Sequence, residues 1–246
     1  MKTIKIADQK LYAVRSLRNQ MGDKFNRIYK IAGMGNNLTD KLDTFIEVVN
    51  SERAQCALAV KICLHTGIRI GNEDSAEGYM TKPHPNQKGV KPEFRQTYGL
   101  TTLLKEHIRF VAGYVRFEFL GKKGVEQVIV IRDKKLVAQI KSLYVTSNSD
   151  TLLEINDTQV RKFVKKSIGK QFMPKDLRTL HANLIATETI MQLSKKKLPQ
   201  KKSEYNMEVK HICETVSERL GNTPGICKRS YIDPMILDYH FELRSL

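Results

Sequence analysis

Four segments of the chain place a phosphate-binding or nucleophilic side chain beside small residues, at the edge of a predicted helix or hairpin. Arg69 follows a Thr-Gly pair, and Lys122 lies in a Gly-Lys-Lys-Gly turn. Arg178 comes shortly after a proline at a predicted helix start, and Asn222 and Tyr231 lie nine residues apart near the end of the sequence. Guanidinium and ammonium groups bind phosphate oxygens, and a phenol can attack phosphorus when positive charge surrounds it. These residue types therefore favour chemistry on a phosphodiester.

Each of these side chains also has an ordinary structural explanation. Arg69 could cap a helix end, Lys122 could fill a turn, and Arg178 could form a surface ion pair. Tyr231 could pack in the core. The joint occurrence of the set, in the order Arg, Lys, Arg, Asn and Tyr, is what indicates a site.

The elements that must position these residues are predicted to be mainly helical. Apolar residues recur at helical spacing over 23–64, again after Asp133, and once more over 174–193. A further helix ends at Gly221, a residue type common at helix C-termini. Its apolar face consists of Val209, Ile212, Val216 and Leu220.

Between the predicted helices, the spacing of apolar residues changes from a helical period to a strand period. Apolar residues alternate along 107–132, which predicts a small antiparallel sheet with the Gly-Lys-Lys-Gly turn at a hairpin tip. The segment 75–96 carries three prolines among polar and basic residues, so it is predicted to be an exposed, inserted loop.

The predicted fold is mainly α with a small three-stranded antiparallel β-sheet (α+β), in a single domain over residues 1–246. Its predicted parts are a helical N-terminal part (1–52), a core (53–194) with the β-hairpin 107–132, a basic linker (195–203) and a C-terminal segment (204–246) that contains Tyr231.

The charge balance points to a polyanionic partner. The chain has 42 Lys and Arg against 26 Asp and Glu, a net charge of +16. Such a surplus attracts nucleic acid by releasing its condensed counterions. No apolar stretch of about 18 residues is present, so no membrane association is expected. The predicted DNA contacts are Lys123, Lys175, Lys195, Lys196, Lys197, Lys228 and Arg229.

The cysteine pattern predicts free thiols and no metal site. Of four cysteines, Cys56, Cys63 and Cys213 are expected to be buried and structural, and no Cys or His spacing is typical of a metal centre. The first ten residues lack the apolar stretch of a secretory signal. We therefore expect an intracellular protein that is not secreted.

The sequence around these residues resembles the catalytic domain of type IB DNA topoisomerases, especially bacterial, poxvirus and large-virus members. The resemblance covers roughly residues 54–233. Its most specific pieces are Thr66-Gly-Ile-Arg-Ile-Gly-Asn-Glu73, Tyr98-Gly-Leu-Thr-Thr-Leu103, Lys175-Asp-Leu-Arg-Thr179 and Leu220-Gly-Asn-Thr-Pro224.

The resemblance implies a role for each candidate residue. Tyr231 would attack the phosphodiester and form a 3′-phosphotyrosyl bond. Arg69 and Arg178 would bind the non-bridging oxygens, and Asn222 would donate an amide hydrogen bond where other members use His or Asn. Lys122 would protonate the leaving 5′-oxygen.

The lysine assignment has a neighbouring alternative, because Lys123 follows Lys122 directly. The Gly-Lys order of the family favours Lys122. The resemblance further implies relaxation of supercoiled duplex DNA by a monomer, without ATP, a metal ion or any other cofactor.

Two other functions are compatible with the same residues. Tyrosine recombinases share the phosphotyrosyl chemistry, but they usually have His where this chain has Lys175 and Asn222. A basic DNA-binding protein without catalysis would need only the net charge.

One departure from the family concerns the start of the chain. Bacterial and poxvirus members usually carry a small strand-rich N-terminal domain that closes over the opposite face of DNA, whereas the 68 residues before Arg69 read as helical. We therefore expect that this clamp half is absent, that the chain holds DNA from one side, and that its DNA retention is weak and salt-sensitive.

Overall fold

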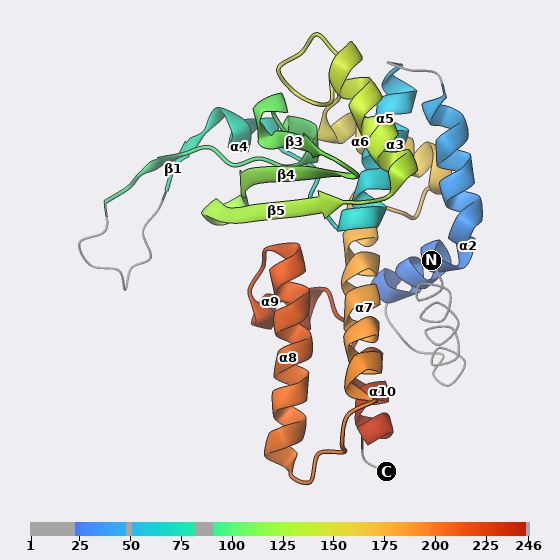
Figure 1. Cartoon of the computed structure of the whole chain (residues 1–246), viewed down its shortest axis with the longest axis vertical. Helices are drawn as coiled ribbons and strands as arrows, with labels where there is room; N and C mark the ends of the chain where they lie inside the picture. The colour runs from blue at the N-terminus through green and yellow to red at the C-terminus, as the bar shows by residue number, and fades with distance from the viewer. Residues whose placement is uncertain (1–22, 48–50, 82–90, 245–246) are drawn as a thin grey trace. The chain divides into compact units, whose positions relative to one another are not determined.

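The computed structural model describes residues 23–47, 51–81 and 91–244 (Figure 1). The chain divides into two compact units. The central unit is Asp40–Lys170, and the terminal unit combines Met1–Thr39 with Gln171–Leu246. Helix α2 (Asp23–Ile46) contributes to both, and Gly35, with φ 48° and ψ −133°, interrupts its helical geometry. The single domain predicted from the sequence stays a prediction.

The core of the central unit is built around α3 (Glu52–Thr66). This helix is buried on nearly all sides, with Ala57, Val60 and Ile62 fully inaccessible, so its apolar residues form no single stripe. It contacts α5 (Lys134–Thr146) and α6 (Asp157–Phe163). The latter continues into a short π-helical turn, η4 (Val164–Ile168).

The predicted three-stranded antiparallel sheet is confirmed. It consists of β3 (Ile108–Val111), β4 (Tyr114–Gly121) and β5 (Val125–Ile131) in that order. Along β4, Val115 and Phe117 are fully buried while alternate residues are more exposed. This alternation gives the sheet one apolar face.

The described part of the predicted inserted loop is more regular than expected. After α4 (Glu73–Glu77), two short strands, β1 (Tyr79–Met80) and β2 (Phe94–Arg95), pair in antiparallel fashion. Residues 82–90, which include two of the prolines, lie outside the described residues. The prediction of exposure holds for Met80 and Phe94, which are 56% and 64% exposed. Two short 3-10 turns follow, η1 (Leu100–Thr102) and η2 (Lys105–His107).

In its described part, the terminal unit consists of helices joined by turns, without a strand. Helix α7 (Pro174–Leu193) begins with proline at its first position and runs antiparallel to α8 (Lys202–Leu220), which it contacts (Figure 1). Gly221 ends α8 in the left-handed conformation, as predicted. The short helix α9 (Pro224–Ser230) and α10 (Pro234–Arg244) follow. The predicted linker is shorter than expected, because α8 already begins at Lys202.

An ion pair in the terminal unit ties α10 to the turn between α7 and α8. Arg244 donates two hydrogen bonds to Glu208 and further ones to the carbonyls of Lys196 and Lys197. These bonds hold the turn's backbone, while the side chains of both lysines remain exposed. The C-terminal helix therefore shapes the basic turn.

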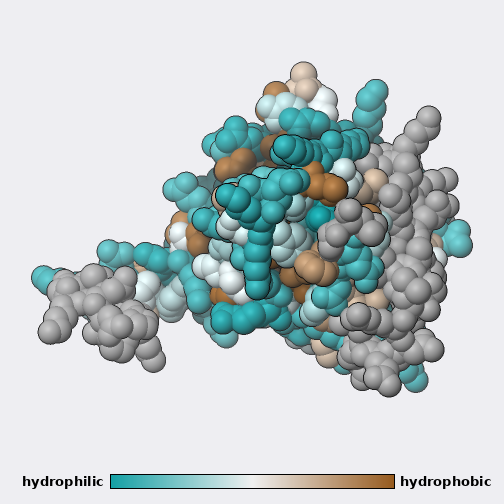
Figure 2. All heavy atoms as spheres, turned by 90° about the horizontal axis from the view of Figure 1, so that it is seen from below, coloured by the Kyte–Doolittle hydropathy of each residue, from teal (hydrophilic) through white to brown (hydrophobic). Residues whose placement is uncertain are grey.

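The surface and the cysteines agree with the composition. The face seen in Figure 2 is mostly hydrophilic, with apolar residues scattered over it. All four cysteines are buried free thiols, including Cys227. Among the described residues, no helix has both the length and the apolar composition needed to traverse a bilayer.

Candidate active site

Arg69 lies where the sequence predicted, just beyond the end of α3. Gly67 ends the helix with φ 66°, and Thr66 braces the turn by donating to the Ile62 carbonyl (2.7 Å) and accepting from the Ile68 N–H (3.1 Å). The carbonyl of Arg69 accepts a hydrogen bond from the Leu100 N–H (2.8 Å). Arg69, which is half-buried, therefore follows a turn that hydrogen bonds hold in place.

Two glycines explain why the motifs around Arg69 and Leu100 occur together. A Cβ built on Gly99 would lie 2.7 Å from backbone atoms of Gly71, and one on Gly71 would lie 2.6 Å from Thr102 Oγ1. Real Cβ atoms essentially never come within 3.0 Å of another heavy atom, so a side chain at either position would force its neighbours to shift. The segments 66–73 and 98–103 therefore pack backbone against backbone.

Lys122 and Lys123 occupy the tip between β4 and β5, as predicted. Both side chains are exposed, and Lys123 has φ 65° within the short turn η3 (Lys122–Gly124). The base of the tip is held by a hydrogen bond from the Tyr98 N–H to the Leu120 carbonyl (2.8 Å). Arg95 of β2 also donates to the Lys123 carbonyl (3.3 Å). Sequence reasoning missed Arg95, because nothing in the spacing links β2 to this hairpin.

In the terminal unit, the nucleophile candidate lies against α7. Tyr231 follows α9 directly and is 5% exposed. The Arg178 guanidinium carbon lies 5.5 Å from the centre of its ring, and Lys175 Nζ lies 5.7 Å from it. Both distances are within the range of cation–π attraction. The structure therefore brings Lys175, Arg178 and Tyr231 together.

Arg178 is itself buried, at 5% exposure. The sequence predicted it in the first turn of α7, and it lies one residue beyond that turn. Its guanidinium donates a hydrogen bond to the Leu220 carbonyl, at the end of α8. Asn222 follows in the same turn and donates its backbone N–H to the Ser217 carbonyl (3.1 Å). Arg178 thus holds the turn that carries Asn222 against α7.

A buried asparagine, missed by sequence reasoning, fixes the backbone of the nucleophile. Asn183 of α7 is fully buried and donates to the Tyr231 carbonyl (2.8 Å) and the Thr179 carbonyl (2.7 Å). Its side-chain oxygen accepts from the Asp233 N–H (2.7 Å). Its place on α7, four residues after Thr179, was the available hint, but a helical Asn is ordinarily assigned to the surface.

The beginning of α2 also contacts this region. Lys24 donates to the Ser230 carbonyl, and Tyr29 donates to Asp233 Oδ2 (2.6 Å). Arg27 makes a two-pronged ion pair with Asp176 at 2.9 and 3.1 Å. Burial raises the pKa of Asp233, although the Tyr29 hydrogen bond opposes that shift. No sequence pattern distinguishes these residues from others on the helix.

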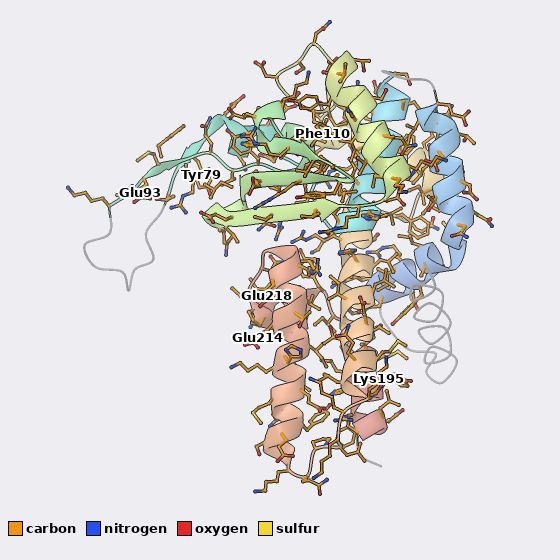
Figure 3. The ribbon with its side chains drawn as sticks, in the orientation of Figure 1. Tyr79, Glu93, Phe110, Lys195, Glu214 and Glu218 are labelled. Atoms are coloured by element: carbon orange, nitrogen blue, oxygen red, sulfur yellow. The ribbon has the colours of Figure 1, made fainter. Side chains whose placement is uncertain are left out.

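Of the remaining predicted DNA contacts, two lie near this cluster and three lie apart from it. Lys228 and Arg229 are exposed on α9, one turn before Tyr231. Lys195, labelled in Figure 3, follows the C-terminal end of α7, as do Lys196 and Lys197. At ~1.5 Å per residue, this turn lies roughly 25 Å along α7 from Arg178. The basic turn is therefore not part of the cluster around Tyr231.

Among the described residues, no group of His, Cys, Asp and Glu side chains could hold a metal ion. The cations that could face a phosphate are instead arginines and lysines, which carry their charge without a metal. Arg69 and Lys122 belong to the central unit, and Arg178, Asn222 and Tyr231 belong to the terminal unit.

Comparison with known proteins identifies the family. A family model of the eukaryotic DNA topoisomerase I catalytic core matches residues 14–231, and the match ends on Tyr231. The chain belongs to the type IB DNA topoisomerase family. It is 24% identical over 169 residues to the DNA topoisomerase 1B of Acanthamoeba polyphaga mimivirus. That alignment covers 63% of this chain and 49% of the relative, so the chain spans about half the length of the viral protein.

Proposed function

We propose that this chain cuts and reseals one strand of duplex DNA through a covalent bond to Tyr231, and thereby relaxes supercoils without ATP or a metal ion. The observation that carries the proposal is the position of the Tyr231 ring, 5.5 Å from the Arg178 guanidinium and 5.7 Å from the Lys175 ammonium. The family match, which extends to Tyr231, supports it.

The cleavage step needs positive charge around phosphorus. As the Tyr231 oxygen bonds to phosphorus and the bond to the 5′-oxygen breaks, negative charge grows on the non-bridging oxygens. Arg69 and Arg178 would stabilise that charge, since a guanidinium keeps its proton and offers a planar pair of donors. Asn222 would add an amide hydrogen bond to the same oxygens.

The leaving 5′-oxygen needs a proton as its bond to phosphorus breaks. Lys122, exposed at the hairpin tip, would supply it, and the phenol proton would pass from Tyr231 to solvent water as attack proceeds. The product is a phosphate ester of tyrosine and a free 5′-hydroxyl. One ester has replaced another, so the 5′-hydroxyl can attack back and reseal the strand without ATP.

Relaxation occurs between cleavage and resealing, when torsional strain rotates the free end. The enzyme then needs to hold DNA on one side of the break, which phosphate contacts achieve without reading the sequence. The net charge of +16 and the exposed Lys228 and Arg229 beside the nucleophile support such contacts. We propose that a monomer acts on duplex DNA in this way.

The test is relaxation of a negatively supercoiled plasmid by the purified chain, with a chelator present and ATP omitted. We expect a ladder of relaxed topoisomers and, after denaturant quenching, protein covalently attached to a 3′-end. Tyr231→Phe should abolish both while preserving salt-sensitive DNA binding, because only the hydroxyl is lost. Tyr239→Phe, on α10, is the matched control and should behave as the unaltered chain.

Two results would overturn the proposal. Covalent attachment that survives Tyr231→Phe would show another nucleophile. Strand exchange between paired sites without relaxation of a single plasmid would instead favour a recombinase.

A further inference from the structure

The first turn of α2 brings a lysine to the peptide bond that precedes the proposed nucleophile. Lys24 donates a hydrogen bond to the carbonyl of Ser230, and that carbonyl belongs to the peptide whose nitrogen is that of Tyr231. Arg27 and Tyr29, further along α2, bind Asp176 and Asp233. In Figure 1 the start of α2 lies beside α7. Contacts that are remote in sequence thus converge on the segment 230–233.

Lys24 also belongs to a group of charges around the Tyr231 ring. Burial is the main cause that lowers the pKa of Lys24, and the nearby Lys175 ammonium lowers it further. The negative charges of Tyr231, Asp176 and Asp233 oppose this shift. Lys175 itself lies 5.7 Å from the ring centre. Lys24 is therefore close enough for its charge to interact with that of the phenolate.

The two acidic neighbours of Lys24 are already engaged by other groups. Asp176 is 2% exposed and accepts both hydrogen bonds from Arg27, and it also accepts from the Met173 N–H (2.9 Å). Asp233 accepts from Tyr29 and from the Met235 N–H (3.0 Å). Arg178 adds a further positive charge on the α7 side of the ring. Lys24 therefore joins Lys175 and Arg178 as a third cation near Tyr231.

We infer that Lys24 is a positioning residue for the cleavage step: it holds the Ser230–Tyr231 peptide in place and adds a positive charge that favours the phenolate of Tyr231 during attack. The inference rests on the proposed function, because it concerns the nucleophile of that reaction. Lys24 acts through Tyr231 and the peptide before it, and DNA binding does not require it.

The test separates the hydrogen bond of Lys24 from its charge. Lys24→Gln keeps a side-chain donor but removes the charge, and Lys24→Arg keeps both. Lys30→Gln, an exposed lysine on the same helix, is the matched control. Single-turnover cleavage of a nicked oligonucleotide duplex is measured across pH, and DNA affinity is measured in the Tyr231→Phe background.

We expect Lys24→Gln to slow cleavage by about tenfold or more near neutral pH. Loss of one charge interaction of this kind changes the acid dissociation constant of the neighbouring group by about tenfold. The deficit should shrink as pH rises, because hydroxide then removes the phenol proton without help. Lys24→Arg should restore most of the rate, and Lys30→Gln should leave it unchanged. DNA affinity should stay within about twofold throughout.

Three outcomes would overturn the inference. These are an unchanged rate in Lys24→Gln, a deficit that is equal at every pH, and a deficit explained by weaker DNA binding. The last would make Lys24 a phosphate contact.

A titration without DNA distinguishes failure of this inference from failure of the proposed function. The lysines are reductively methylated with ¹³C-formaldehyde and a borohydride reductant and followed by NMR. We expect the pKa of Lys24 to lie below the ordinary value of a lysine, and Tyr231→Phe to lower it further, because the phenolate that raises the Lys24 pKa is gone. An unchanged midpoint would overturn the pairing even if the chain relaxes DNA. A chain that shows the coupling but never cleaves would overturn the function and leave the pairing standing.

Discussion

The two units present their candidate site residues in opposite ways. In the terminal unit, Arg178 and Tyr231 are each 5% exposed, and hydrogen bonds from α2 and α7 hold the surrounding backbone. In the central unit, Lys122 is exposed at a hairpin tip and Arg69 is half-buried beyond a helix end. The proposed nucleophile is therefore built into a core, whereas the proposed acid is displayed on a turn.

Because of this difference, substitutions in the two units should affect fold stability and the cleavage rate to different extents. A side chain that also supports the core cannot be removed without loosening the fold, because its buried partners lose their hydrogen bonds. An exposed lysine makes no such contribution, so its removal should lower the cleavage rate without lowering the free energy of unfolding. Variants in the two units should therefore fail in distinguishable ways.

After loss of the Tyr231 hydroxyl, the largest expected effect is at the hairpin tip. Lys122→Ala should slow cleavage by roughly 10²- to 10⁴-fold, the usual cost of losing a general acid, with no change in the unfolding midpoint. Single-turnover cleavage and thermal unfolding measure the two quantities. Lys123→Ala is the matched variant and should change the rate only a few-fold. If the larger loss follows Lys123, the acid has been assigned to the wrong lysine.

The next largest effect is expected at Asn183, which hydrogen-bonds to the backbone of Tyr231 and of Asp233. Asn183→Ala should lower the free energy of unfolding by about 3 kcal/mol, because the Tyr231 carbonyl and the Asp233 N–H both lose a buried partner. Cleavage should also slow, since the nucleophile loses its anchor. Denaturant unfolding gives the stability, and exposed Asn206→Ala serves as the control. A stable but slow variant would mean that Asn183 acts on the chemistry alone.

A smaller effect is expected where the two backbone segments meet in the central unit. Gly99→Ala places a methyl group 2.7 Å from Gly71, so either segment must shift, at a cost of about 1 to 3 kcal/mol. Gly225→Ala, in α9, meets nothing within 4 Å and should be neutral or slightly stabilising. Urea unfolding of both variants provides the comparison. Equal stability of the two would show that the close approach is not present in solution.

The smallest effect concerns acid stability of the central unit. Burial would raise the pKa of Asp43, but hydrogen bonds from Gln139, Lys135 and Lys61 outweigh it and hold the pKa at about 2. A lowered carboxyl pKa contributes stability above the unfolded value near 4, and that contribution is lost as pH falls toward 2. We expect a loss of roughly 1 to 2 kcal/mol over that range.

The measurement is unfolding as a function of pH for the unaltered chain and for Asp43→Asn. The variant should lack this part of the acid dependence and should be less stable at neutral pH. A variant with the same acid dependence as the unaltered chain would assign the effect to other carboxyl groups.

Much of the fold could be read from local patterns. The end of α3 at Gly67, the end of α8 at Gly221 and the hairpin around Lys122 all depend on residues close in sequence, and each was predicted. The inserted segment was predicted as an exposed loop, but its two strands were not predicted, because pairing of Tyr79–Met80 with Phe94–Arg95 joins residues on either side of a proline-rich stretch that gives no strand period.

By itself, the sequence determined most of the helices, the three-stranded sheet, the net charge and the identity of the candidate residues, since these depend on side-chain type and short-range spacing. Tertiary structure alone decided which of them meet: Arg178 and Lys175 lie against the Tyr231 ring, whereas Lys195 lies at the far end of α7. It also revealed Lys24 and Asn183, whose contacts with 230–233 join residues 206 and 48 positions apart. Local periodicity carries no information about such pairs, because burial and long-range packing select them only after the chain has folded.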